Sequence, residues 1–404
     1  MTVRRSAGGR AAAALAVSAL ASLSGLLVAV AVARTSSTVD TGKYGIATSA
    51  LLLVTALARS AVTDPLVADA GRTPSGTRSL GRASLIGVSG AVVLLGVGTT
   101  TVSEDLLIAA VAAHGLTVRE CVRAVLVAIG SARTAVVLEA TWAAASAVAF
   151  LGTLAGAWGG SVAFALWAGS GAVLGYVAAA RTGSDLVPVW SRTPVPGERS
   201  VAFASDTLIG SGVVQLVTWI ATAIGGLSIA AALRGAGTLA GPVTVGLSAA
   251  RAVLIPRTLR HLESTGGVRG LVVDTALMTA LALPALTALS FIPDPIGRAL
   301  LGDTWRLVAP ILPLTALELL FQLVAAVPES AHRALGRGGR IVAVRSGSAV
   351  VRIPVVVLAA LSGLDAVVAA AAVVTMLSAT AWWVSLATMS RPTPSHRVLP
   401  DVAT

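Results

Sequence analysis

The chain has little of what water-soluble proteins need. Charged residues make up only 12% of its 404 residues, hydrophobic residues make up 55%, and the mean hydropathy is +0.87. Soluble domains carry about 25% charged residues. This composition excludes a soluble enzyme, a nucleic-acid-binding domain and a disordered chain. The chain has one cysteine, Cys121, which excludes a disulfide framework, a zinc cage and an iron–sulfur cluster.

Long apolar segments are what the chain has instead. A helix needs about 20 mostly apolar residues to cross about 30 Å of hydrocarbon. The fourth such segment is too short on its own, and we expect its helix to continue through Arg119, Glu120 and Arg123 to about residue 129. The sequence therefore predicts an all-α polytopic membrane protein with twelve transmembrane helices: 11–33, 44–67, 85–102, 106–118, 134–154, 161–180, 206–232, 237–255, 271–292, 307–327, 341–361 and 364–389.

The charges of the connections predict the orientation of these helices. The formal net charge of +11 comes from 29 Lys and Arg against 18 Asp and Glu, and cytoplasmic connections are where Lys and Arg gather. With the N-terminus inside, Arg59 and Arg352 stay within spans and all but a few of the other cations fall on the inner side. We therefore predict a multi-pass chain with both termini cytoplasmic, in which the outer side receives only Arg34, Lys43, Arg234, Arg298 and Arg306.

The longest polar connection lies in mid-chain and carries Pro188, Pro194 and Pro196. It predicts an N-terminal six-helix lobe at 1–180, a cytoplasmic linker at 181–202, a C-terminal six-helix lobe at 203–390 and a cytoplasmic tail at 391–404. An even number of spans per half returns the chain to the same side. The halves are thus predicted to be repeats related by a pseudo-two-fold axis along the membrane normal.

Residues that would indicate catalysis are few. Glu104 and Asp105 fall in one short outer connection. We interpret them as polar caps of the two adjacent spans and not as catalytic acids. No glycine-rich phosphate loop with a following lysine is present. The four histidines are scattered: His114, His261, His332 and His396. We therefore predict no enzyme activity, no catalytic residue, no metal site and no cofactor.

Several short segments resemble a known family. Tyr44 and Gly45, leading into an apolar helix that ends at Pro65, are similar to the start of bacterial oligosaccharide flippases. The stretch 231–242 (AALRGAGTLAGP) resembles the opening of their second half. The stretches 301–305 (LGDTW) and 333–337 (RALGR) resemble the connections before their tenth and eleventh helices.

The resemblance implies the fold of the multidrug/oligosaccharidyl-lipid/polysaccharide exporter superfamily, with two six-helix lobes around a central cavity. It implies flipping of a polyprenyl-pyrophosphate-linked oligosaccharide across the bacterial inner membrane by alternating access, for surface polysaccharide biosynthesis. Partners would be that substrate, membrane lipids, and polysaccharide polymerases and glycosyltransferases. The first span lacks the acidic residue of cation-coupled drug exporters in this superfamily, which disfavours that branch. Two alternatives stay open: an exporter of another amphiphile (lipid II or a drug), and a polytopic polymerase or glycosyltransferase.

Arginines inside spans are the candidate pyrophosphate ligands. A charge at mid-bilayer costs roughly 2.5–3.5 kcal/mol or more, so one that is present is expected to face a wet cavity, and guanidinium matches phosphate oxygens. Arg59 and Arg251 precede Pro65 and Pro256 at similar spacings, which predicts near-equivalent places in the two halves. Snorkelling to the headgroups is the alternative for both. The predicted cavity residues are Arg59, Arg251, Arg352 and Arg345.

Further polar residues inside spans complete the predicted site. Arg352 lies two turns from Arg345 on one helix face, and a structural ion pair with Glu139 or Glu318 is its alternative role. Glu318 is either that partner or a coupling site for a proton or cation. Gln215 and Trp219 stand four residues apart, so an amide and an indole share one face and are candidates for sugar contact, with interhelical packing as the alternative.

Overall fold

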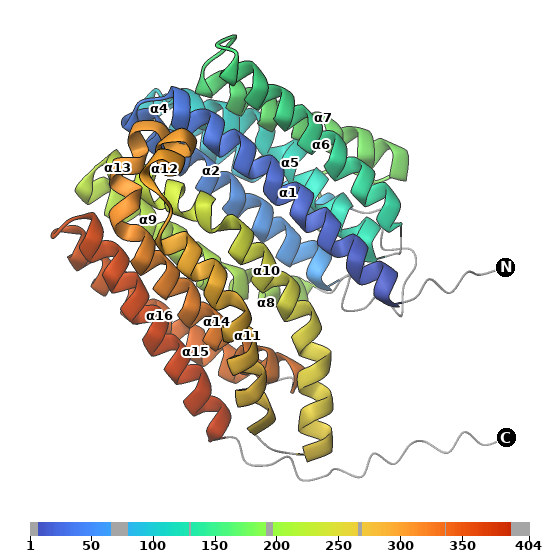
Figure 1. Ribbon diagram of the computed structural model, residues 1–404. Helices are drawn as coiled ribbons and strands as arrows, with labels where there is room; N and C mark the ends of the chain where they lie inside the picture. Colours follow the sequence, from blue (N-terminus) through green and yellow to red (C-terminus); the bar gives the residue numbers. More distant parts are fainter. Residues whose placement is uncertain are drawn as a thin grey trace.

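The computed structural model describes residues 7–65, 80–128, 131–190, 197–265, 269–335 and 337–388, with side chains described from residue 12 on and not at 197–199, 247–265 and 334. The described residues are almost wholly helical (Figure 1). The predicted tail at 391–404 lies outside them.

The first half of the chain forms six helical segments. They are α1 (Ala7–Thr35), α2 (Thr38–Ala58) with the π-turn η1 (Arg59–Thr63), α4 (Gly81–Thr101), α5 (Glu104–Ala128), α6 (Ala132–Leu154) and α7 (Gly160–Thr182). The continuation of the fourth helix through Arg119, Glu120 and Arg123 is confirmed by α5.

The second half forms six more segments, of which the seventh and tenth are built from several short helices. The seventh segment consists of α8 (Gly197–Thr207), η3 (Leu208–Gly212) and α9 (Val213–Gly225). The eighth and ninth are α10 (Leu227–Thr265) and α11 (Arg269–Ser290). The tenth consists of α12 (Asp294–Leu301), η4 (Gly302–Thr304), α13 (Trp305–Val308), η5 (Ala309–Ile311) and α14 (Leu312–Ala334), and the last two are α15 (Gly338–Ala360) and α16 (Leu364–Ala387).

Ten of the twelve segments are long and apolar enough to cross a membrane by length and composition alone. The other two, α5 and α10, are interrupted by charged residues.

The predicted boundary between the seventh and eighth spans is wrong. Gly226 adopts φ +88° and ψ 169°, a conformation that residues with a Cβ rarely adopt. The chain therefore turns there, between α9 and α10, and not at 233–236 as the hydropathy suggested. The predicted place of Arg234 in an outer connection is wrong for the same reason, because Arg234 lies two turns inside α10.

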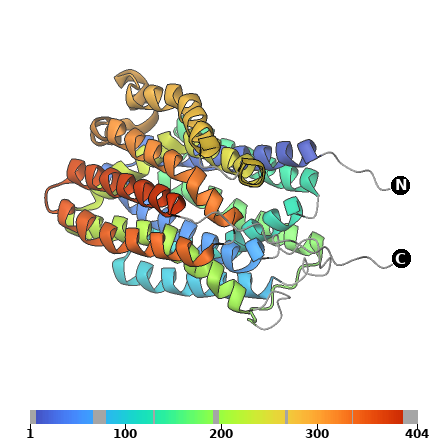
Figure 2. The ribbon, with the colours of Figure 1, turned by 90° about the horizontal axis from the view of Figure 1, so that it is seen from below.

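The two halves of the chain form separate helix clusters. In the first half α5 packs on α4 and α7, and α1 packs on α6. In the second half α14 packs on α10, α11 and α16, and α15 packs on α16. Each cluster has its own apolar core, one centred on Phe164 and Trp167 and the other on Trp305 and Leu312. The start of α1 and the end of α16 lie at the same end of the bundle (Figures 1 and 2), as an even number of spans requires.

The clusters meet mainly where α2 packs against α10. A Cβ added at Gly45 would lie 3.2 Å from the Ala230 carbonyl oxygen and from the Arg234 Cβ, so glycine is what permits this approach. At the same end Arg34 Nη1 donates to the Ala299 carbonyl at 2.8 Å, which joins α1 to α12. Towards its first residues α1 draws apart from the far end of α10 (Figure 1).

Candidate functional site

A cavity of about 370 Å³ lies where the second-half helices face α2. In its wall Arg352 Nη2 on α15 donates to Glu318 Oε1 on α14 at 2.9 Å, and Thr375 Oγ1 on α16 donates to the same oxygen at 3.1 Å. The Arg352 and Glu318 side chains keep 18% and 17% of their surface exposed. The partner of Arg352 is thus Glu318 and not Glu139, and the pair forms part of the cavity wall together with Gln215, Gln322 and Arg234.

A second cavity of about 340 Å³ extends the first along α15, and Gln215, Gln322 and Arg352 line both. Arg345 lines this second cavity, two turns along α15 from Arg352 as the helical spacing predicted. Arg345 is not free for a ligand. Its guanidinium donates to Asp206 Oδ1 at 2.7 Å and to Glu329 Oε1 at 2.6 Å, and so ties α15 to α8 and α14.

Gln215 and Trp219 differ in what they contact. Gln215 lines both cavities of the second half. The Trp219 indole Nε1 donates to Ser49 Oγ on α2 at 2.7 Å, a hydrogen bond between the two clusters. Trp219 is not among the residues that line the described cavities. Its contact in the structure is the one between helices, which was the alternative to sugar contact.

Arg59 lies apart from these cavities. Its side chain is 52% exposed, with Nε 3.4 Å from Asp64 Oδ1 and Nη1 3.7 Å from Glu120 Oε1. The side chain of Arg251 lies outside the described residues. Of the four predicted arginines, the structure therefore brings together Arg345 and Arg352, both on α15.

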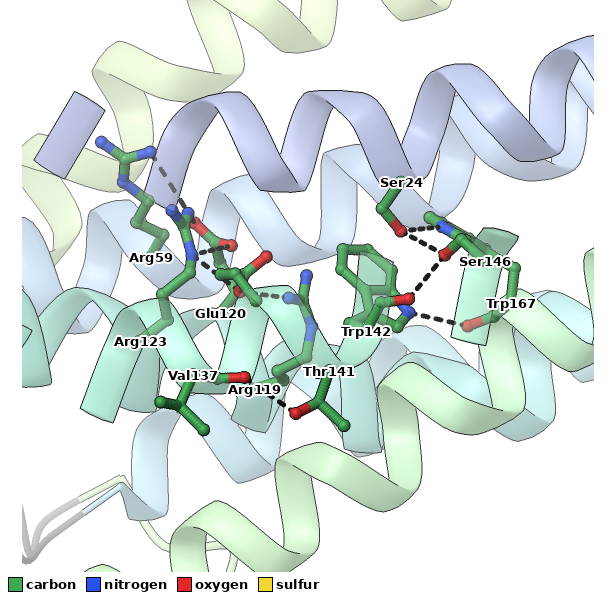
Figure 3. Close-up of polar contacts among 11 residues, drawn as sticks. Ser24, Arg59, Arg119, Glu120, Arg123, Val137, Thr141, Trp142, Ser146 and Trp167 are labelled. Atoms are coloured by element: carbon green, nitrogen blue, oxygen red, sulfur yellow. Dashed lines mark hydrogen bonds and ion pairs between the residues drawn. The ribbon is translucent and has the colours of Figure 1, made fainter. Parts of the chain in front are cut away.

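A chain of alternating charges runs through the first-half cluster (Figure 3). Arg119 on α5 donates to Glu139 on α6, Arg123 donates to Glu120, and Arg123 Nε lies 3.7 Å from Glu139 Oε1. Arg59 reaches Glu120 at the end of the chain. Glu139 is fully buried, and burying an unpaired charge would cost several kcal/mol. The two guanidiniums at Glu139 compensate its charge inside the cluster.

The ion pairs between helices in the two halves join matching helices with reversed sign. In the first half the fourth segment, α5, supplies the bases Arg119 and Arg123, and the fifth, α6, supplies the acid Glu139. In the second half the tenth segment supplies the acids, and the eleventh supplies Arg345 and Arg352. An ion pair thus joins the same two helices of each repeat without sequence similarity at the paired positions.

The largest cavity described, about 650 Å³, lies between the two clusters. Helices α1 and α10 form two of its walls, and α2, α5, α6 and α7 contribute Thr48, Arg119, Glu120, Trp142 and Trp167. Arg119 stacks on the ring of Trp142, with its Cζ 3.5 Å from the ring centroid. The Trp142 indole donates to the Trp167 carbonyl at 2.9 Å, and the Trp167 indole donates to Ser24 Oγ at 3.1 Å, which fixes both rings (Figure 3).

Arg234 is the site residue that sequence reasoning missed. It lines both the 370 Å³ cavity and the 650 Å³ cavity. Its Nη2 donates to the Tyr44 hydroxyl at 3.3 Å, its Cζ lies 5.4 Å from the Tyr44 ring centroid, and its Nε has no hydrogen-bond partner. Within the described part of the chain no carboxylate forms an ion pair with Arg234. The predicted helix boundary was placed in error just before Arg234, which put this residue in a connection. A boundary at Leu227, where α10 begins, would have shown an arginine inside a span.

Arg234 therefore differs electrostatically from the other arginines around it. Arg119, Arg345 and Arg352 each face a carboxylate, so their charges are compensated. Among the described residues, the charge on Arg234 is met by a phenol ring and its hydroxyl alone. An uncompensated guanidinium within a membrane protein is costly, and an anion entering either cavity would remove that cost through charge-assisted hydrogen bonds.

No family model matches the chain, and no curated protein matches it. Solved transporters share its fold. One is a multidrug resistance MATE family transporter of the MOP superfamily in an outward-facing conformation, with a TM-score of 0.60, 11% identity and 93% of each chain covered. A MOP superfamily transporter from Pyrococcus furiosus, whose binding pocket is described as having reverse polarity, gives 0.58 at 12% identity, again with 93% of each chain covered. A MATE in complex with MaD5 gives 0.59 at 11% identity, with 93% of each chain covered.

These likenesses establish the fold. The chain has the all-helical architecture of MOP superfamily transporters, with two lobes of six membrane-spanning segments, and it is a multi-pass membrane protein. The predicted fold class is confirmed.

Proposed function

We propose that this protein is a transporter that flips a polyprenyl-pyrophosphate-linked oligosaccharide across the inner membrane by alternating access, for surface polysaccharide biosynthesis. The observation that carries the proposal is Arg234, which lines two cavities and has no carboxylate partner among the described residues. A lipid-linked pyrophosphate is an anion that must leave water to cross the bilayer. A guanidinium that lacks a counterion offsets that desolvation and binds the phosphate oxygens.

Arg352 supports the same proposal as a second arginine of this cavity. It lines the 370 Å³ cavity with Arg234, and its charge is shared with Glu318. The two arginines and one glutamate leave this cavity with one positive charge in excess. That excess favours an anionic head group over a cationic drug.

Export of a different amphiphile is the second candidate. It is supported by the multidrug resistance transporter of the same fold. The charge balance of the cavity distinguishes the two candidates, because a lipophilic cation would be repelled by Arg234. A polymerase or glycosyltransferase is the less favoured alternative, since the described connections between helices are short. Polymerases and glycosyltransferases are proposed as partners that consume and supply the substrate.

Transport in proteoliposomes tests the proposal. The purified protein is reconstituted with undecaprenyl-pyrophosphoryl-N-acetylglucosamine in one arm and with ethidium in the other. We expect translocation of the saccharide lipid and none of ethidium, and we expect Arg234→Gln to lower the lipid rate at least about tenfold, the cost of one charge-assisted hydrogen bond. Arg298→Gln is the matched control, because Arg298 is 62% exposed and its ion pair within the described part of the chain is with Asp294. Ethidium transport without lipid transport would select the second candidate.

A further inference from the structure

We infer that the 650 Å³ cavity between α1 and α10 is a saccharide subsite that holds the neutral sugar residues of the substrate, next to the phosphate site at Arg234, which lines the same cavity. This inference rests on the proposed function and adds the part of the substrate that this cavity binds. Its volume lies within the range of about 300–1,000 Å³ that small-molecule sites occupy.

The charges that line this cavity, apart from Arg234, are already compensated. Arg119 is paired with Glu139, and Glu120 is paired with Arg123. Their charged groups therefore do not require an ionic ligand. They present hydrogen-bonding groups to the cavity with little net charge, which suits a neutral ligand rich in hydroxyl groups.

The remaining polar lining consists of hydroxyl groups that have acceptor capacity. Thr48 Oγ1 and Thr238 Oγ1 donate to the carbonyls of Tyr44 and Arg234 in their own helices. Each hydroxyl oxygen keeps lone pairs that accept a hydrogen bond, and Ser22 adds a further hydroxyl on α1. Sugar hydroxyls are donors that such a lining would satisfy.

Two largely buried indole rings of fixed orientation form part of the cavity wall. Trp142 and Trp167 lie with their ring centroids 5.0 Å apart, and Arg119 covers one face of Trp142. An indole ring held beside paired charged groups gives a ligand both an apolar surface and neighbouring polar groups. A pyranose has the same two-sided character, with C–H groups on its faces and hydroxyl groups around its rim.

Glycines keep the walls of this cavity open. A Cβ added at Gly25 on α1 or at Gly241 on α10 would meet nothing within 4 Å, and both residues line the cavity. This is unlike Gly45, where the packed helices leave no room. The space beside Gly25 and Gly241 is therefore unfilled by the protein and available to a ligand.

The position of Arg234 links the two parts of the site. Because Arg234 lines both cavities, a phosphate bound to it has the cavity with Trp142 and Glu120 on one side. The sugar attached to that phosphate would then extend into the 650 Å³ cavity.

Binding of lipids with and without a sugar tests the inference. Protein in nanodiscs is titrated with undecaprenyl pyrophosphate and with its glucose, galactose and N-acetylglucosamine conjugates. We expect the wild type to bind at least one conjugate about tenfold more tightly than the sugar-free lipid. Gly241→Leu and Gly25→Leu each place a branched side chain inside the cavity where a sugar would lie, so each should abolish that difference and keep the affinity for the sugar-free lipid.

Gly96→Leu is the matched control. Gly96 lies inside α4, a Cβ there also meets nothing within 4 Å, and Gly96 does not line the described cavities. It should retain both affinities. A wild type that binds all four lipids equally, or glycine variants that keep the preference for the conjugate, would overturn the saccharide subsite. A wild type that binds none of the four lipids would instead contradict the proposed function.

Discussion

The Tyr44 hydroxyl accepts a hydrogen bond from Arg234 Nη2 at 3.3 Å, and this contact joins the two halves of the chain. Tyr44 and Arg234 belong to two segments, 44–45 and 231–242, that each resembled the flippase family in sequence. The structure brings these segments together on α2 and α10, beside the close approach at Gly45. The two segments thus form one interface between the lobes, and the arginine in it has no acidic partner among the described residues.

The Tyr44 hydroxyl is expected to stabilise the fold without being needed for transport. Tyr44→Phe removes one hydrogen bond, worth about 0.5–1.5 kcal/mol, and keeps the ring that contacts Phe164 at 5.0 Å between centroids. Thermal unfolding in detergent should show a small loss of stability, and proteoliposome transport should stay within about twofold of wild type. Tyr44→Ala deletes a fully buried ring and should cost about 3–5 kcal/mol. Abolished transport in Tyr44→Phe would show that the hydroxyl itself contacts the substrate.

The Glu318–Arg352 pair predicts opposite effects of removing its two members. Glu318 and a substrate phosphate would compete for Arg352, because the carboxylate already holds Arg352 Nη2 at 2.9 Å. Glu318→Gln should tighten binding of undecaprenyl pyrophosphate, and Arg352→Gln should weaken it, each by about tenfold. Titrations of both variants measure the effect. Equal weakening by both substitutions would mean that the pair only holds α14 against α15.

The buried Glu139 is expected to matter for stability. Glu139→Gln leaves the guanidiniums of Arg119 and Arg123 without their shared carboxylate, and breaking a buried pair costs about 3–5 kcal/mol. The midpoint of thermal unfolding in detergent should fall by several degrees. Lys43→Gln is the control, because its pair with Asp40 is about half exposed and worth about 0–1 kcal/mol. Similar midpoints for the two variants would contradict a structural role for Glu139.

The predicted orientation can be tested by cysteine labelling in intact cells. Cys121 is buried, so the background should be low. Ala157 is exposed between α6 and α7, and Val187 is exposed after α7, on opposite sides of the membrane by the charge rule. We expect a membrane-impermeant maleimide to label Ala157→Cys at once and Val187→Cys only after permeabilisation. The reverse pattern would place both termini outside.

The sequence predicted the architecture well because hydrophobic length and loop charge are local properties. A bilayer requires about 20 apolar residues per span wherever they occur, so the twelve segments could be counted without knowing their neighbours. The exception, between α9 and α10, depends on Gly226, whose backbone conformation leaves no trace in hydropathy. That single glycine decides whether Arg234 lies in a connection or inside a helix.

The candidate site was only partly predictable. Arg352 and Glu318 could be identified from their places within spans, since charges inside a membrane need partners. Glu139 was considered only as a partner of Arg352, and Arg119 only as part of the continued fourth helix, because nothing local indicates that α6 covers that end of α5.

The sequence by itself determined the number of spans, the predicted orientation and two of the residues whose charges compensate each other, Arg352 and Glu318, because each depends on the local exchange of water for hydrocarbon. Only the tertiary structure decided that Arg119 has a carboxylate and that Arg234 faces two cavities without one. That difference depends on which helices lie side by side. Helix packing couples residues far apart in the chain, and no local pattern of hydropathy or charge encodes which residues it brings together.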